Sequence, residues 1–206
     1  MLVLALDTTG PDCSCALVRD GATLVQASER IGRGHAERLA PMVEEAFAAA
    51  GLAPADVDRV AVCTGPGSFT GLRVALSFAK GFALPRGLPV VGVNALEIGA
   101  EALRRDGDTL VGVMRDIRRG EIMFALYSHG KPLDPPRAMT MAEAEELADE
   151  CQAGIHEVET VDVALLGDLA ASLDPDDYLP DAFYSRGPDA KLPGGLTPPL
   201  STPLPR

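Results

Sequence analysis

The protein is a chain of 206 residues with 47% hydrophobic side chains, which is long enough to bury a core as one domain or two small ones. Its net charge of −12 opposes unaided binding to the phosphates of a nucleic acid over a broad surface. No apolar run reaches the roughly 18 residues of a membrane-spanning helix, so an integral helical membrane protein is excluded.

The first residues, MLVLALDTT, predict a buried strand rather than a secretory signal. They carry no basic leader and reach Asp7 after too few apolar residues. We therefore expect a cytoplasmic protein whose cysteines are reduced and buried. Their spacing matches no zinc pattern, which predicts no metal site: Cys13, Cys15, Cys63 and Cys151.

Three extended segments open the chain and predict an antiparallel meander: LVLALDTT, CSCALVRD and ATLVQASER. The last two are joined by Asp20 and Gly21, a strong hairpin signal. An amphipathic helix follows in HAERLAPMVEEAFAAAG and ends at Gly51.

Strands and helices then alternate, which predicts parallel pairing and a mixed sheet covered by helices. The segments are strand RVAVCTG, a helix from about Thr70 to Leu84, strand LPVVGV and helix ALEIGAEALRR.

The second half of the chain carries weaker signals. TLVGVMRD and EIMFALYSHG predict a strand pair around IRRG, TMAEAEELADE opens with a capping box, and DVALLGD is interpreted as one more strand. From Asp174 the composition turns to proline, glycine and acids, which predicts a flexible end. We divide the chain into an N-terminal part, 1–105, a smaller second part, 106–190, and a tail, 191–206.

The segment GPGSFTG places Gly65, Gly67 and Gly71 between a strand and a helix. It fails the dinucleotide pattern because residue 70 is threonine, and no Gly-Lys-Ser/Thr follows for a P-loop. A helix N-terminus behind such a turn can hold an anion. The glycines can equally serve close packing of the strand and the helix, and the residues alone leave both interpretations open.

The helix after this loop is apolar on nearly every side, with only Arg73, Ser77 and Lys80 as polar members from residue 72 to residue 84. A helix of this kind is buried on more than one side. The residues expected to cover the sheet are Leu72, Ala75, Leu76, Ala79 and Ala83. Those left for a second contact, with another subunit or within the same domain, are Val74, Phe78, Gly81 and Phe82.

Other polar residues each have two interpretations. Asp7 ends the first strand, where an acid can hold hydrated magnesium, or else it forms a polar turn with the two threonines that follow. The segment RDIRRGE is either a solvated hairpin tip or a small basic contact for a partner or RNA through Arg115, Arg118 and Arg119. The three histidines lack ligand spacing, and His35 is interpreted as a cap or a surface contact.

Six segments together resemble the TsaB (YeaZ) family, the non-catalytic subunit of the bacterial machinery that makes threonylcarbamoyladenosine beside the anticodon of tRNA. They are LALDTT, RGHAERLAP, GPGSFTGLRVALSFAKGFAL, PVVGVNALE, DIRRGE and FYSRGPDAKLP. The resemblance implies an α/β fold of the actin-like, Hsp70-like ATPase (ASKHA) superfamily. It would have ribonuclease-H-like mixed sheets flanked by helices and a degenerate second half.

The catalytic paralogue, TsaD, is similar over the same glycine block and carries two metal-binding histidines in a segment like NHLEGH. Here Ala95 and Gly99 stand at those positions, and neither can ligate a metal. The resemblance thus implies no catalytic residue, no metal and no cofactor. It leaves relic phosphate loops at Asp7, Thr8, Thr9, Gly65, Gly67, Ser68 and Gly71.

The resemblance also implies partners: a homodimer when alone, a TsaD-type transferase, a TsaE-type ATPase, tRNA indirectly, and no membrane. We place the partner interface on helices of the first half, at Leu72, Val74, Leu76, Phe78, Phe82, Met42 and Phe47. The alternative is an ATP-dependent transferase or kinase of the same superfamily that acts on its own, with Asp7 and the 65–71 loop on phosphate.

Overall fold

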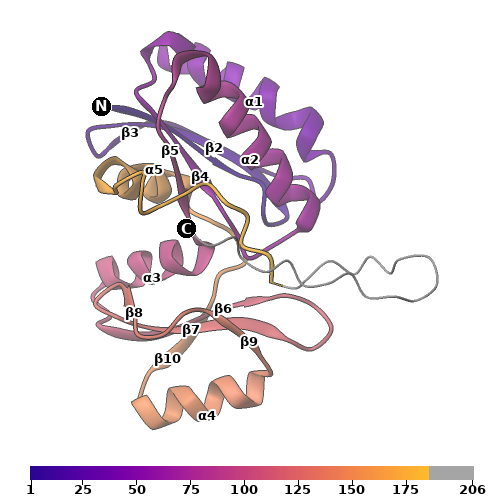
Figure 1. Ribbon diagram of the computed structural model, residues 1–206, viewed down its shortest axis with the longest axis vertical. Coiled ribbons are helices and arrows are strands. Elements are labelled where there is room, and N and C mark those ends of the chain that lie inside the picture. Colours follow the sequence, from indigo (N-terminus) through magenta and orange to yellow (C-terminus); the bar gives the residue numbers. More distant parts are fainter. Residues whose placement is uncertain (186–206) are drawn as a thin grey trace, which may run out of the picture.

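The computed structural model describes residues 1–185 and arranges them as two sheets with helices packed on their faces (Figure 1). Helix α3 lies between the two sheets, with the first sheet above it and the second below. Within the described residues, no helix is long and apolar enough to cross a membrane. The predicted tail, 191–206, and the end of the FYSRGPDAKLP segment lie outside the described residues.

The first sheet has the strand order β3-β2-β1-β4-β5. Strand β1 pairs antiparallel with β2, β2 pairs antiparallel with β3, and β1, β4 and β5 are parallel. The predicted meander and the predicted parallel strands are therefore confirmed. Their bounds are β1 Leu2–Asp7, β2 Asp12–Arg19, β3 Ala22–Arg30, β4 Arg59–Cys63 and β5 Val90–Val93.

Helices cover both faces of this sheet. Helices α1 (His35–Ala50) and α2 (Phe69–Ala83) pack on one face, and α5 (Val163–Ser172) packs on the other. Side chains of a strand alternate between faces, so the even residues of β1 join the α1 and α2 core, while Val3 and Ala5 join the α5 core. Burial on both faces explains why β1 is a continuous apolar run.

The prediction that DVALLGD forms a strand is wrong, because these residues begin helix α5. The side chain of Asp162 caps the helix by accepting bonds from the backbone N–H groups of Ala164 and Leu165 at 2.9 and 3.2 Å. A short helix buried among apolar side chains has no polar face, and its sequence shows no period that distinguishes it from a buried strand.

The second sheet has the strand order β10-β6-β7-β8, and β9 pairs with β7. Like the first sheet, it mixes antiparallel and parallel pairs. Strands β6 and β7 are antiparallel, as predicted, whereas β10 runs parallel to β6. Helix α3 packs on one face and α4 on the other, and the predicted capping box of α4 is present. The bounds are α3 Ala95–Asp106, β6 Leu110–Asp116, β7 Ile122–Ser128, β8 Lys131–Pro132, β9 Arg137–Met139, α4 Met141–Cys151 and β10 Gly154–Glu157. Short 3-10 turns occur at Pro54–Asp56 and Leu84–Arg86.

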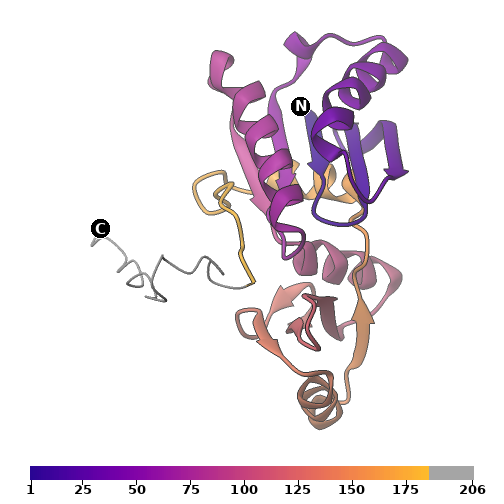
Figure 2. The same cartoon turned by 90° about the vertical axis from the view of Figure 1, so that its right-hand side faces the viewer.

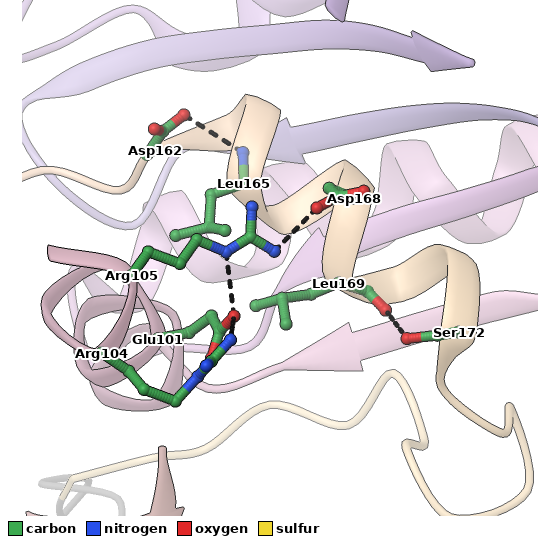
Figure 3. Close-up of polar contacts among 8 residues, drawn as sticks. All are labelled: Glu101, Arg104, Arg105, Asp162, Leu165, Asp168, Leu169 and Ser172. Atoms are coloured by element: carbon green, nitrogen blue, oxygen red, sulfur yellow. Dashed lines mark hydrogen bonds and ion pairs between the residues drawn. The ribbon is translucent and has the colours of Figure 1, made fainter. Parts of the chain in front are cut away.

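Charged side chains join α3 to α5 (Figure 3). Glu101, only 9% exposed, accepts hydrogen bonds from the guanidinium groups of Arg104 and Arg105. Arg105 then reaches across to Asp168 of α5 at 2.7 Å. This network links a helix of the second sheet to a helix of the first.

The Glu101→Gln variant should be less stable than the wild type at pH 7, because it loses its charge pairing with two arginines. The loss should be only about 1 kcal/mol, because both arginines are half-exposed and solvent screens their charges. Hydrogen bonds from Arg104 and then Arg105, opposed by burial, lower the pKa of Glu101 to about 2. The stabilisation is therefore full above the unfolded pKa of about 4.3 and is lost as the pH falls toward 2. Urea unfolding at pH 7 and at pH 3 measures this, and an equal loss at both values would contradict the assignment.

Candidate functional site

The turn after β1 is a buried polar junction between the strand and the glycine loop. Asp7, Thr8 and Thr9 are 1%, 0% and 2% exposed. The Asp7 carboxylate accepts a hydrogen bond from the backbone N–H of Thr9 at 2.9 Å. The Thr8 hydroxyl donates to the carbonyl of Gly71 at 2.6 Å and accepts from the N–H of Ala75. These three side chains are therefore buried and hydrogen-bonded within the protein.

The glycine loop lies directly against this turn. The N–H of Ser68 donates to the carbonyl of Thr9 at 2.8 Å. A Cβ atom placed on Gly67 would lie 2.3 Å from that same oxygen, and one placed on Gly71 would lie 1.9 Å from the carbonyl oxygen of Thr8. Close packing of backbones therefore accounts for Gly67 and Gly71. Ser68 serves as the N-cap of α2 and accepts from the N–H of Gly71.

Arg115 is the residue of this junction that the sequence did not single out. Its side chain is 5% exposed, and Nη1 donates to Thr9 Oγ1 and to the carbonyl of Pro66, both at 2.9 Å. Nη2 donates to the carbonyl of Glu159 at 3.0 Å. The period-2 alternation of β6, with Val111 and Val113 on the same buried face, was the available signal.

The other two arginines of RDIRRGE lie apart from Arg115. Arg118 and Arg119 are exposed at the turn between β6 and β7, and both have left-handed backbones, with φ of 72° and 62°. The prediction of a solvated hairpin tip is therefore confirmed for Arg118 and Arg119. Contact of any of the three arginines with RNA stays a prediction.

Burial sets the protonation of the junction. It raises the pKa of Asp7, while the positive charge of Arg115 and the hydrogen bonds from Thr9 oppose that rise. Burial also raises the pKa of the Cys63 thiol to about 12, and this thiol lies 3.7 Å from Thr9 Oγ1. Cys63 is therefore a neutral neighbour, and Arg115 supplies the positive charge at the junction.

A polar cleft of about 940 Å³ lies between the loops of the first sheet and the second sheet. Arg115 and Thr9 lie at its boundary, and an ion pair of Arg30 with Glu159 lies beside them. His35 also lines it, with a buried Nε2 that has no hydrogen-bond partner among residues 1–185. The remaining charged lining residues carry both signs: Asp116, Arg118 and Glu157.

The face of α1 and α2 turned away from the sheet carries a second, more apolar groove of about 590 Å³. Figure 2 is viewed from the side of these helices and shows them in front of the first sheet. We call this surface the α1–α2 groove. Its lining residues are Ala36, Leu39, Phe69, Thr70, Arg73, Val74, Ser77 and Phe78.

The predicted interface set is corrected by burial. The side chains of Leu72, Leu76, Met42 and Phe47 are 1%, 7%, 0% and 4% exposed and belong to the core beneath the helices. They have almost no surface to offer a partner, so we remove them from the set.

Val74, Phe78 and Phe82 are half-buried, and their contact with a partner stays a prediction. The rings of Phe78 and Phe82 stack with centroids 6.2 Å apart. The five residues predicted to cover the sheet are all buried, as expected.

An exposed cluster at the start of α2 was not predicted. The Arg73 guanidinium lies 3.8 Å from the centroid of the Phe69 ring, and Arg73 Nε donates to the hydroxyl of Tyr184 at 3.2 Å. Phe69 is 52% exposed and borders both the cleft and the α1–α2 groove. Tyr184 belongs to FYSRG, so the family motif was the signal that pointed here.

Ala95 and Gly99 lie in the first turns of α3, the first buried and the second half-buried. Ala95 is fully buried. A Cβ atom placed on Gly99 would lie 2.3 Å from Cγ2 of Val158, so even an alanine would need a shift. In residues 1–185 no group of three or more histidine, cysteine and acidic side chains is arranged to hold a metal ion.

The strand orders define the class of protein: an α/β protein of two ribonuclease-H-like mixed sheets, the fold of the ASKHA superfamily. The structure of YeaZ from Pseudomonas aeruginosa superposes with a TM-score of 0.72 at 25% identity, covering 89% of this chain and 99% of that chain. A second Pseudomonas aeruginosa structure, described as an uncharacterized protein with similarity to peptidase YEAZ, gives a TM-score of 0.73 at 25% identity, with 90% and 99% covered.

Sequence comparisons agree. The family profile "TsaD: tRNA N6-adenosine threonylcarbamoyltransferase" matches residues 27–170. The tRNA threonylcarbamoyladenosine biosynthesis protein TsaB of Escherichia coli K12 is 40% identical over 128 residues, 62% of this chain and 55% of the relative. An uncharacterized protein of Mycobacterium tuberculosis H37Rv is 40% identical over 161 residues, 71% of this chain and 74% of the relative. The chain belongs to the TsaB/YeaZ family, and its match spans about half the length of the Escherichia coli relative.

Proposed function

We propose that the chain is a non-catalytic subunit of the complex that adds the threonylcarbamoyl group to the adenosine beside the anticodon of tRNA. In that role it binds and activates a TsaD-type transferase. The TsaD profile and the TsaB relative support the pathway. The observation that carries the accessory role is the presence of Ala95 and Gly99, which cannot ligate a metal, at the two histidine positions.

The TsaD-like segment of this chain lacks both histidines, and neighbouring side chains pack against the two positions. Gly99 is in contact with Val158, and Ala95 has no exposed surface, so an imidazole at either position would displace its neighbours. The polar junction supports the same proposal, because the Asp7 carboxylate and the glycine loop are each hydrogen-bonded to the backbone of Thr9. The chemistry then belongs to the partner.

The α1–α2 groove is the surface we propose for that partner, and for a second copy of the chain when it is alone. It combines an exposed aromatic ring, Phe69, with an arginine, Arg73, and with apolar walls at Val74 and Phe78. Aromatic and arginine side chains are enriched at protein interfaces, and charged residues are depleted at their centres. A self-complementary use of one groove by two copies gives a two-fold dimer.

Reconstitution of tRNA threonylcarbamoylation tests the proposal. The reaction would hold the TsaD-type transferase, a TsaE-type ATPase, ATP, the activated threonylcarbamoyl donor and tRNA, with or without this chain. We expect modified nucleoside only when the chain and the transferase are both present. The proposal is overturned if the transferase is equally active without the chain. Modification by the chain alone, or its saturable magnesium-dependent binding of ATP, would instead support the independent transferase or kinase.

A further inference from the structure

We propose that Arg115 is a built-in counter-charge for the buried carboxyl of Asp7 and joins the two sheets through the turn that follows it. This inference concerns the chain alone. It stands whether or not the chain serves a TsaD-type transferase.

The contacts of Arg115 connect four separate segments. The side chain comes from β6 and bonds to Thr9 after β1, to Pro66 in the glycine loop and to Glu159 after β10. Strand β1 belongs to the core of the first sheet, and β6 belongs to the core of the second. A single buried guanidinium therefore fixes the position of one sheet relative to the other, and its planar set of donors suits three acceptors at once.

All three acceptors of Arg115 are neutral oxygens, so its charge is balanced through Thr9 rather than by direct contact. Thr9 accepts from Arg115 at Oγ1 and donates from its backbone N–H to the Asp7 carboxylate. The pair is thus connected by one residue, and all three side chains are buried, where a charge left alone is costly.

Titratable groups near this pairing include two thiols and Glu159, whose pKa is lowered mainly by Arg30 and to a smaller extent by the charge of Arg115. Cys63 on β4 and Cys13 on β2 lie near Asp7, and burial raises their thiol pKa values to about 12 and about 11, so both are neutral. The carboxylate of Glu159 forms its ion pair with Arg30 at the surface. Arg115 is then the cation acting on Asp7.

The space between the Arg115 guanidinium and Gly10 is also filled. A Cβ atom placed on Gly10 would lie 2.7 Å from Arg115 Nη2 and 2.9 Å from the carbonyl oxygen of Glu159. The guanidinium therefore occupies the gap between the first turn and the segment after β10. A side chain at residue 10 has no room beside it.

The test is the pH dependence of unfolding in four variants: Arg115→Gln, Arg115→Lys, Asp7→Asn and the double variant Asp7→Asn with Arg115→Gln. Without the guanidinium, the folded pKa of Asp7 rises further above its unfolded value of about 3.9, because only the hydrogen bonds to the carboxyl then oppose burial. A carboxyl with a raised folded pKa loses stability as the pH rises above the unfolded value. The Arg115→Gln variant should therefore lose more stability at pH 8 than at pH 5. Its folding constant should fall about tenfold for each unit by which the folded pKa of Asp7 rises within that pH range.

The double variant separates the proposal from a general packing loss. We expect Asp7→Asn to remove the extra pH dependence of Arg115→Gln, and Arg115→Lys to retain part of the wild-type profile. If Arg115→Gln does not fold, the double variant should still fold. Amide hydrogen exchange at Thr9 and Ser68 should be faster in Arg115→Gln but unchanged in Arg119→Gln, an exposed arginine of the same hairpin. An equal loss at both pH values, with or without Asp7, would overturn the proposal.

Discussion

The Gly71→Ala variant is expected to lose about 3 kcal/mol or more of folding stability, a large part of the total for a chain of this size. The new methyl carbon would lie 1.9 Å from the carbonyl oxygen of Thr8, well inside van der Waals contact. The backbone cannot retreat without cost, because the Thr8 hydroxyl binds the Gly71 carbonyl and the N–H of Ala75. Helix α2 would have to move away from the end of β1.

Urea unfolding followed by circular dichroism measures the change, and Gly81→Ala is the matched control. Gly81 lies on the same helix, with no heavy atom within 4 Å of the added carbon and without a left-handed backbone. Its replacement should stabilise the chain by about 1 kcal/mol through helix propensity. If the two variants behaved alike, the backbone contact between Gly71 and Thr8 would be disproved.

The second large effect concerns association. Ser77→Arg and Phe78→Asp, each placing a charge in the α1–α2 groove, should weaken binding to the TsaD-type transferase and to a second copy by about 100-fold or more. A charge buried against an apolar partner loses its hydration without gaining a counter-ion. Ser77 is exposed in the isolated chain, so its variant changes the surface without opening the core.

Size-exclusion chromatography and sedimentation of mixtures measure this loss of association. Leu133→Asp is the control, because Leu133 is 53% exposed and lies outside the groove, on the side of the second sheet. Ser77→Arg and Leu133→Asp should keep the wild-type circular dichroism spectrum and melting temperature within a few degrees, whereas Phe78→Asp should also lower the melting temperature, because it removes a ring packed on Phe82. Co-elution of Ser77→Arg with the transferase at wild-type affinity would place the interface elsewhere.

Much of the first sheet could be predicted because its signals are local. The Asp20-Gly21 turn, the glycine at residue 51 and the alternation of apolar strands with helices each follow from a few neighbouring residues. Helix α5 and strand β10 could not be predicted in this way, because both are short and depend on distant segments. Helix α5 is buried against the first sheet, and β10 pairs with β6. The division at residue 105 stays a prediction.

The candidate site was predicted unevenly. The turn residues after β1 and the glycine loop meet in the structure, and the sequence had marked both segments. Arg115 was grouped with two exposed arginines because adjacency in sequence hid the different directions of their side chains. Met42 and Phe47 were placed at an interface because an apolar residue facing the core and one facing a partner look the same in a helical pattern.

The position of α5 has a consequence for how the chain is made. Residues 163–172 complete a core that also contains Val3 and Ala5, so the first strand emerges from the ribosome long before the helix that covers one of its faces. Contacts this far apart in sequence form slowly. The N-terminal sheet must wait for most of synthesis before it can close. The two halves should then unfold as one cooperative unit, and a chain truncated before residue 163 should aggregate through the exposed face of β1.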